Sequence, residues 1–446
     1  MRPSPALAAI TLLWFFLGAA GFFSDFFSLI WLFTGLTLLF IIAADALFHF
    51  FLCDTLQVKR NINTSLAQGE SVTVKLEITR SGKGFLPRGI LLWDLHPSTM
   101  ETKAFPSALN RKLLSGAGPL IFEYSLLPRE RGQWFFRGTE LLLSSPLRLW
   151  RLKVLHPTAS TVKVYPDFRK IKAAAGADLR GLLERTGLKN IRMRGAGLEF
   201  RSLRDYQEGD SIRAVDWRAT SRRRKVIIRE YQEEQDQQIL FLLDSGYRLH
   251  RLEESGRRQF DSALEAVLLL SWASLKHGDS VAVGSFGSES RGGKSRWITP
   301  RKGVSAFPVL MNSLYDLSSA PVPSSPFSAL EDALARLKRR TFIILISNFR
   351  EEDGESLSWI LKRIERQHLL LMVSLREKES EYLAARKASG NEEALETAAA
   401  FSYLAKRREL YAAWEHSGLL TMESSAEDLS ASLINRYLQV KRAGSL

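Results

Sequence analysis

The fold of the C-terminal half is decided by two neighbouring segments, QILFLLD (Gln238–Asp244) and RRQFDSALEAVLLLSWASLK (Arg257–Lys276). The first is a continuous apolar run that ends in an acid, which is typical of a strand buried on both faces of a sheet. The second carries apolar residues at helical spacing and is ended by His277-Gly278. A strand followed by such a helix predicts a parallel sheet covered by helices.

The same alternation continues along the chain, so residues 237–446 are predicted to form one α/β domain with a mostly parallel sheet and helices on both faces. Further strands are expected at Ser280–Phe286, Thr341–Ser347, His368–Leu375 and Leu419–Glu423, and helices at about 303–317, 326–340, 354–366, 391–415 and 426–440. In such sheets ligands bind beyond the carboxyl ends of the strands, which places Asp244 and Asn348 together at the candidate site. The charged stretch 376–416 is interpreted as an exposed helical excursion, either a solvated face or a docking surface.

Residues 53–166 show the alternation of half-buried strands. Val72, Val74, Leu76 and Ile78 alternate with polar residues. Further strands are expected at Ile90–Leu95, Leu120–Leu126, Gly132–Leu143 and Thr161–Tyr165. Short strands at this spacing predict an antiparallel β-sandwich, interpreted as a structural or docking module.

Residues 1–52 contain two uncharged apolar stretches, which predict a transmembrane hairpin with spans at about 5–23 and 27–50. Trp14 and Trp31 are expected near the membrane interfaces. A signal peptide is the alternative for the first stretch. Lys and Arg occur outside the two spans and not in the turn between them, so both termini and the large soluble part are expected in the cytoplasm. Asp45 and His49, one helical turn apart, form either a functional acid site or a pair at headgroup level.

The composition excludes several classes of site. The chain has 446 residues, a net charge of +14 and a single cysteine, Cys53, which rules out an intramolecular disulfide and a cysteine-based zinc site. One cysteine also fits a reducing compartment. The sequence has no Gly-rich phosphate loop, nucleophile elbow, zinc motif or kinase signature. We therefore expect that the protein is not an enzyme.

Residues 167–236 form a charged junction. The stretch 189–229 holds twelve Lys or Arg and five acids, which is half of the excess charge of the whole chain. Such a stretch could bind the phosphates of nucleic acid or lipid, with Tyr206 and Trp217 stacking on bases. The close interleaving of acids and bases favours a mutually paired network, used in the structure or at a protein interface, over an open cationic surface.

The string GLEFRSLRDYQEGDSIRAVDWRATSR (Gly197–Arg222) closely resembles the signature of a bacterial membrane family called domain of unknown function 58. The segments Pro146–Trp150 and Val164–Pro166 extend the resemblance. It implies a C-terminal domain similar to von Willebrand factor A domains and a partnership with a MoxR-type AAA+ ATPase, and it assigns no catalytic roles. We expect the structural and interaction core of the signature to be Glu199, Phe200, Arg204, Tyr206, Gly209, Asp210, Arg213, Asp216, Trp217 and Arg222.

The resemblance also bears on metal binding. An A domain that binds Mg²⁺ uses Asp-x-Ser-x-Ser after its first strand and an aspartate after its fourth. Here the first motif reads Asp244-Ser245-Gly246-Tyr247-Arg248, and Asn348 follows the fourth strand in place of an acid. Mg²⁺ needs several oxygen ligands, and Arg248 would add positive charge. We expect neither metal nor cofactor, with Asp244 the one weak candidate ligand and paired instead to Arg248 or a neighbouring arginine.

These features predict a non-enzymatic adaptor or scaffold of the bacterial inner membrane, which works with a MoxR-type ATPase in protein-complex assembly or envelope homeostasis. The alternative is a membrane-tethered nucleic-acid-binding protein or nuclease that uses the basic stretch 189–229. A third hypothesis is a divalent-cation-dependent adhesion module.

Overall fold

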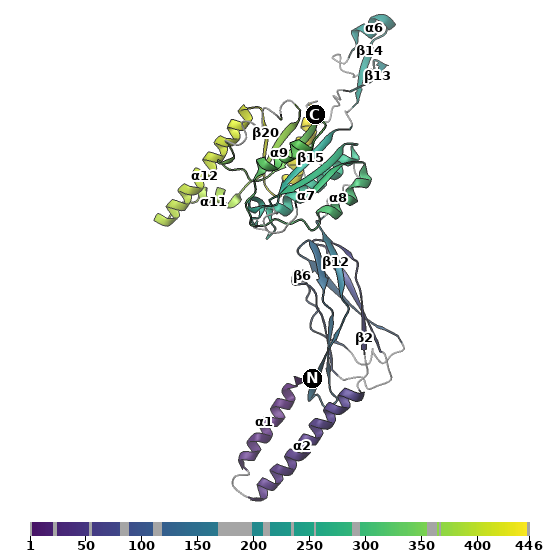
Figure 1. Cartoon of the computed structure of the whole chain (residues 1–446), viewed down its shortest axis with the longest axis vertical. Helices are drawn as coiled ribbons and strands as arrows, with labels where there is room; N and C mark the ends of the chain where they lie inside the picture. Colours follow the sequence, from purple (N-terminus) through teal and green to yellow (C-terminus); the bar gives the residue numbers. More distant parts are fainter. Residues whose placement is uncertain are drawn as a thin grey trace. The chain divides into compact units, whose positions relative to one another are not determined.

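The computed structural model of the chain divides into two compact units, Met1–Asp167 and Phe168–Leu446, which are described separately (Figure 1). The structure describes residues 2–20, 25–52, 56–80, 89–109, 118–167, 199–207, 215–232, 236–253, 256–287, 295–354, 364 and 367–443. Three signature residues, Gly209, Asp210 and Arg213, and most of the helix expected at 354–366 lie outside these ranges.

The first unit begins with two apolar helices, α1 (Pro5–Ala20) and α2 (Asp25–Leu52), which pack against each other (Figure 1). Among the described residues, α2 is the helix long and apolar enough to cross a membrane, and α1 is apolar but shorter. The two helices are joined by a stacked pair, Trp14 and Trp31, whose ring centroids lie 4.5 Å apart. The indole Nε1 of each donates to the backbone oxygen of the other. Each ring fills the space left by a glycine on the opposite helix, Gly35 for Trp14 and Gly18 for Trp31.

The antiparallel sheets predicted for the first unit are confirmed. One sheet has the order β2 (Leu56–Asn61), β4 (Val72–Arg80), β8 (Leu120–Pro128) and β6 (Met100–Glu101). A second has the order β1 (Arg2–Pro3), β11 (Trp150–His156), β10 (Thr139–Ser144), β5 (Ile90–Asp94) and β7 (Ser107–Leu109). A third joins β3 (Ser65–Ala67), β12 (Ser160–Tyr165) and β9 (Gly132–Phe136), with β3 and β12 parallel. All three contribute side chains to one hydrophobic core.

One expected strand is broken in two. The run Gly132–Leu143 forms β9 and β10, which belong to different sheets. The break falls at Gly138, whose φ of 151° and close approach to the carbonyl oxygen of His156 leave no room for a Cβ atom. A glycine inside an apolar strand pattern marks such bends.

The core of the first unit contains a buried ion pair between Arg60 and Asp94. Arg60 Nε donates to Asp94 Oδ2 at 3.0 Å, and the hydroxyl of Tyr124 donates to the same oxygen at 2.5 Å. The guanidinium also lies over the ring of Phe136. Both charged side chains are almost completely buried, so each depends on the other for an opposite charge.

The apolar helices are attached to this β domain at one junction. The carboxylate of Asp45 accepts hydrogen bonds from Ser145 Oγ at 2.6 Å and from the backbone N–H of Leu147 at 3.1 Å. Trp150 Nε1 donates to the carbonyl oxygen of Ile42, and β1, just before α1, pairs with β11. Asp45 and its neighbour His49 are both buried. The loop 146–150, singled out by the family resemblance, is therefore where both helices meet the β domain.

The second unit contains the mostly parallel sheet that the sequence predicted. Its strand order is β17 (Trp297–Lys302), β16 (Ser280–Phe286), β15 (Gln238–Asp244), β18 (Thr341–Ile346), β19 (Leu369–Leu375) and β20 (Leu420–Ser424). The edge strand β17 is antiparallel to β16 and the other pairs are parallel. Sequence patterning missed β17, because Ile298 is its one buried residue and an exposed edge strand lacks the apolar run.

Helices cover both faces of this sheet. The described helices are α7 (Gln259–Lys276), α8 (Phe307–Leu314), α9 (Pro326–Arg336), α11 (Lys378–Ala385), α12 (Asn391–His416) and α13 (Leu429–Arg442). Side chains of α9 and the C-terminal part of α12 share a core with Leu240, Leu242 and Ile343. The alternate strand residues, such as Phe241, face the opposite side, where α7 packs against the strands and against α8 and α13.

We predict that Asp94→Ala lowers the free energy of unfolding by about 3–5 kcal/mol, because it leaves Arg60 buried without its partner. Urea unfolding of the full-length protein in detergent measures the change. The control is Glu123→Ala, which breaks the half-exposed pair with Lys75 in the same unit and should leave the unfolding midpoint nearly unchanged. Equal effects of the two substitutions would contradict a special role for the buried pair.

Candidate functional site

The carboxyl end of β15 lies where the strand order of the sheet reverses, and Asp244 is its last residue. Its buried carboxylate accepts three hydrogen bonds: Oδ1 from the backbone N–H of Gly246 at 2.8 Å, and Oδ2 from Ser324 Oγ at 2.8 Å and Ser347 Oγ at 2.6 Å. Burial raises the pKa of Asp244 above its ordinary value even though these donors lower it. Three separate segments of chain thus close around one carboxylate.

Gly246 makes this closure possible. A Cβ atom at Gly246 would lie 2.7 Å from the Cβ of Ser324, so any side chain would push that serine away from Asp244. Gly287, with a φ of 90°, approaches Ser324 equally closely from the end of β16. Gly246 stands where the metal motif has its first serine. Because it has no side chain, a different serine, Ser324, can reach the carboxylate of Asp244.

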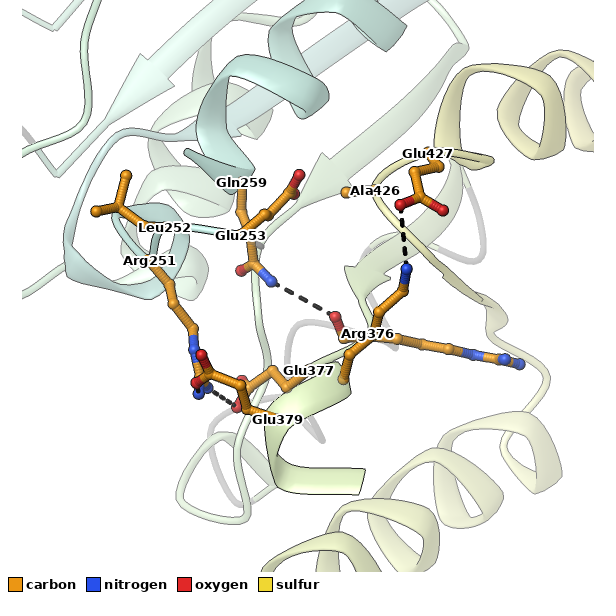
Figure 2. Close-up of a pocket in the computed structure, with 10 residues that line it drawn as sticks. Arg251, Leu252, Glu253, Gln259, Arg376, Glu377, Glu379, Ala426 and Glu427 are labelled. Carbon is orange, nitrogen blue, oxygen red and sulfur yellow. Dashed lines mark hydrogen bonds and ion pairs between the residues drawn. The ribbon is translucent and has the colours of Figure 1, made fainter. Parts of the chain in front are cut away.

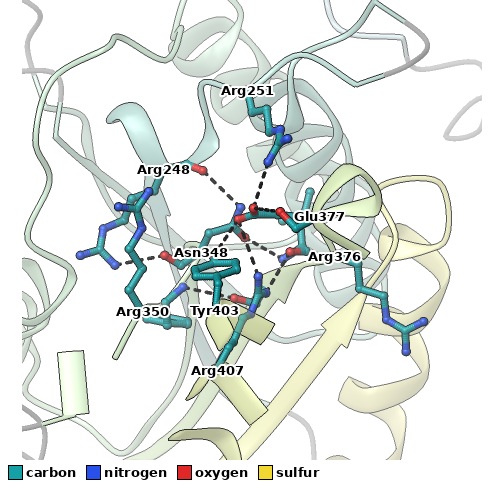
Figure 3. Close-up of polar contacts among 12 residues, drawn as sticks. Arg248, Arg251, Asn348, Arg350, Arg376, Glu377, Tyr403 and Arg407 are labelled. Carbon is teal, nitrogen blue, oxygen red and sulfur yellow. Dashed lines mark hydrogen bonds and ion pairs between the residues drawn. The ribbon is translucent and has the colours of Figure 1, made fainter. Parts of the chain in front are cut away.

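The expected pairing of Asp244 with Arg248 was wrong, because Arg248 pairs with Asp353. Its two terminal nitrogens bind the two carboxylate oxygens of Asp353 at 2.5 and 3.0 Å, and Nη1 also donates to the carbonyl oxygen of Asn348. Arg248 lies in a short 3-10 helix, Tyr247–Leu249, and reaches the loop after β18 (Figure 3). That loop supplies an acid that the sequence motif did not include.

Asn348 is held at the same edge, as the sequence predicted. Its Nδ2 donates to the carbonyl oxygen of Arg248 at 3.2 Å and to Gln259 Oε1 at 2.9 Å, and its Oδ1 accepts from the backbone N–H of Leu375. The amide uses both its donor and its acceptor to join β18 to β19 and α7. An aspartate would leave one of these roles unfilled, since an ionised carboxylate cannot donate.

A second polar network lies beyond the ends of β19 and β20 (Figure 3). The guanidinium of the buried Arg407 donates to the carbonyl oxygen of Leu375 at 3.0 Å and forms ion pairs with Glu423 and Glu377. Arg251 binds Glu377 from the other side at 2.9 Å. Sequence reasoning treated residues 376–416 as a solvated charge run and did not expect an arginine buried within it.

Two of the cavities at this edge lie beside the polar networks just described. One, of about 60 Å³, is lined by Arg251, Glu253, Arg376 and Glu377, with Lys378 and Glu427 paired at its rim (Figure 2). The other, of about 220 Å³, lies beside Ser324 and is lined by Ser285, Trp297 and Arg336. Both are smaller than the roughly 300–1,000 Å³ of typical small-molecule sites. The edge can hold water or a small polar group and offers charged side chains to a larger partner.

The signature residues that the structure describes form a separate hairpin. Strand β13 (Glu199–Asp205) pairs with β14 (Ile227–Gln232), and the helix α6 (Trp217–Arg223) packs beside β14. The positions of Glu199, Phe200 and Arg204 lie on β13, opposite Gln232, Tyr231 and Ile228. The first part of the signature string therefore pairs with the strand that follows the string, which sequence reasoning did not predict.

Residues 202–409 match the model of the family described as "Protein of unknown function DUF58", which spans the hairpin and most of the parallel sheet. This part of the chain belongs to the DUF58 family. A search of curated proteins gave no match.

Two solved structures are similar to parts of the chain at low scores. One is a cohesin module from the family 33 glycoside hydrolase of Clostridium perfringens ATCC13124, with 9% identity over 26% of this chain and 99% of that one, and a TM-score of 0.16. The other is an uncharacterized membrane spanning protein from Vibrio fischeri, with 11% identity over 46% of this chain and 99% of that one, and a TM-score of 0.17. Neither likeness carries an argument about fold or function.

Within the DUF58 signature, Asp216 has an identifiable structural role. Its carboxylate accepts from the backbone N–H groups of Arg218 and Ala219, both at 3.0 Å, and so caps α6. Tyr206, Trp217 and Arg222 are exposed.

We predict that Asp244→Asn alters the pH dependence of stability. Because the folded-state pKa of Asp244 is raised, its carboxyl favours folding at low pH, and this contribution is lost as the pH rises above the ordinary value of about 3.9 and through the folded-state pKa. The wild type should therefore lose stability relative to Asp244→Asn as the pH is raised from acid to neutral. Thermal unfolding of both proteins across that range measures the difference.

Asp236→Asn is the control, because the ion pair with Lys302 lowers the pKa of Asp236. Its wild-type contribution is present above the ordinary pKa and lost as the pH falls, so the trend should have the opposite sign. A difference between wild type and Asp244→Asn that does not vary with pH would show that this carboxyl is not destabilised by burial.

Proposed function

We propose that this protein is a membrane-anchored, non-enzymatic adaptor whose C-terminal domain, similar to a von Willebrand factor A domain, binds a protein partner. The strand order supports the likeness: the first strand, β15, lies inside the sheet and one edge strand, β17, is antiparallel. The main support for the adaptor role is that the polar groups at the edge where such a domain would bind a metal are already paired with one another. Asp244 is occupied by Gly246, Ser324 and Ser347, and Arg248 is paired with Asp353.

The proposed partner contact is the helical pair α11 and α12. Three large apolar side chains lie exposed on it, Tyr382, Leu395 and Phe401, and the last two are 73% and 63% exposed. Exposed apolar groups rimmed by charges are typical of protein interfaces. Glu392, Glu393 and Lys406 supply such a rim on α12. Its C-terminal part, in contrast, is held to the domain by the buried Tyr411 and Trp414.

We also propose that α1 and α2 both cross the membrane, with the chain's termini in the cytoplasm. Two contacts support this arrangement: β1 ties the start of α1 to β11, and Asp45 ties the end of α2 to the loop after β10. Since both outer helix ends meet the same β domain, they lie on the same side of a bilayer. The distribution of Lys and Arg supports the cytoplasm as that side.

The partner that the family resemblance implies is a MoxR-type AAA+ ATPase. We predict that such an ATPase co-purifies with the full-length protein from its own membranes in mild detergent, in an amount that changes with added ATP. Leu395→Asp with Phe401→Asp should lower the retained ATPase at least tenfold, since interface hot spots contribute more than about 1.4 kcal/mol each. Mass spectrometry of the purified material gives the readout.

The control is Leu155→Asp, which places the same charge on an exposed leucine of β11 in the first unit. It should leave retention unchanged. If no ATPase is retained in either nucleotide state and nuclease-sensitive material is recovered instead, the adaptor proposal is wrong. The alternative, a nucleic-acid-binding protein, would then predict affinity that falls by orders of magnitude between about 50 and 200 mM salt.

A further inference from the structure

The surface of α6 combines exposed aromatic and cationic side chains, and neither the sheet nor the proposed ATPase contact uses it. Trp217, the first residue of the helix, is 67% exposed, and Tyr206 and Val226 are exposed beside it in the hairpin, where the Tyr206 N–H donates to the Val226 carbonyl oxygen. The cations of this surface are Arg218, Arg222, Arg223, Arg224 and Lys225. We call these eight residues the α6 surface.

The charge of the α6 surface is open to solvent. Residues 215–226 hold five cations and one acid, Asp216, whose carboxylate is used by the helix backbone. Over the part of the chain that the structure describes, no side chain forms an ion pair with any of the five cations. Five cations at this density, none with an ion-pair partner among the described side chains, are suited to bind a polyanionic surface.

The hairpin holds the α6 surface in a fixed shape. The backbone N–H of Asp216 donates to the carbonyl oxygen of Ile227 at 2.8 Å, and the N–H of Ile227 donates to Thr220 Oγ1 at 2.9 Å. Arg224 ends the helix with a φ of 54°, which turns the chain into β14. The side chains of Ile227 and Ile228 are buried beneath. The cations and Trp217 are therefore presented by a folded element.

We propose that the α6 surface binds the anionic phospholipid headgroups of the membrane that α2 anchors the chain to. Clusters of four to eight Lys or Arg are attracted to anionic bilayers, and tryptophan partitions to the headgroup region, so the two residue types reinforce each other at one surface. The anchor favours lipid over nucleic acid as the polyanion, because it raises the effective concentration of the bilayer surface. The inference rests on α2 spanning the membrane and is independent of any ATPase.

A fluorescent label on α6 tests the proposal in the full-length chain. Cys53→Ser removes the native cysteine, and Ser221→Cys, exposed on α6, takes an environment-sensitive dye. The protein is reconstituted in nanodiscs of phosphatidylcholine alone or of equal parts phosphatidylcholine and phosphatidylglycerol, each with a spin-labelled lipid that quenches at the headgroup level. We expect quenching in the anionic discs that is reversed by salt, and little quenching in the neutral ones.

Charge removal gives the matched comparison. Arg222→Gln with Arg223→Gln should reduce the ratio of bound to free α6 about 25-fold, since each Lys or Arg near an anionic surface changes that ratio about fivefold. Lys338→Gln with Arg339→Gln removes the same charge from exposed residues after α9 and should have no effect. Thermal unfolding confirms that both variants remain folded.

Three outcomes would overturn the proposal. The first is quenching that is equal in neutral and anionic discs, and the second is quenching that is equally strong in both charge variants. The third is a dye that responds to a single-stranded oligonucleotide and not to phosphatidylglycerol, which would assign the α6 surface to nucleic acid. Retention of an ATPase is measured separately, so failure of this proposal and failure of the adaptor role are distinguishable.

Discussion

The carboxylate of Asp244 is the constraint around which the carboxyl edge of the parallel sheet is built. An acid buried at the end of β15 must find hydrogen-bond donors, because no water reaches it. Ser324, Ser347 and the Gly246 N–H supply them from three different segments. Gly246 and Gly287 are needed for the close approach of Ser324. In many sheets of this topology, this position binds a ligand. Here the hydrogen bonds of Asp244 hold three chain segments together instead.

The rest of this edge is held together by ion pairs between the charged residues next to Asp244. Arg248 binds Asp353, and Arg407 with Arg251 shares Glu377, so strands β18 and β19, helix α12 and the loop after β15 are joined by charge-assisted hydrogen bonds. Buried pairs of this kind fix the geometry more than they add net stability. A rigid edge of this type is a suitable platform for the exposed helical pair α11 and α12, which we propose as the contact with a partner.

In the first unit, a buried acid likewise joins the apolar helices to the β domain. Asp45 is an acid within an apolar helix, and its donors come from Ser145 and Leu147 of the β domain. With β1 paired to β11, both helices are attached to the β domain by hydrogen bonds. In the signature hairpin, Asp216 caps α6, and the cations of that helix are exposed.

The sequence by itself determined many of the elements: the apolar helix α2, the strands β4, β5, β8 and β12 of the antiparallel sheets, and the buried strands β15, β16, β18, β19 and β20. Each carries its own burial pattern over a few consecutive residues, which is what periodicity measures. It could not determine which polar groups meet. Arg248 reaches Asp353 across 105 residues and Asp45 reaches Ser145 across 100, and Trp14 stacks on Trp31 of the other apolar helix. Such partners depend on how distant elements pack, so only the tertiary structure decided them, together with the pairing of β13 with β14 and the exposed edge strand β17.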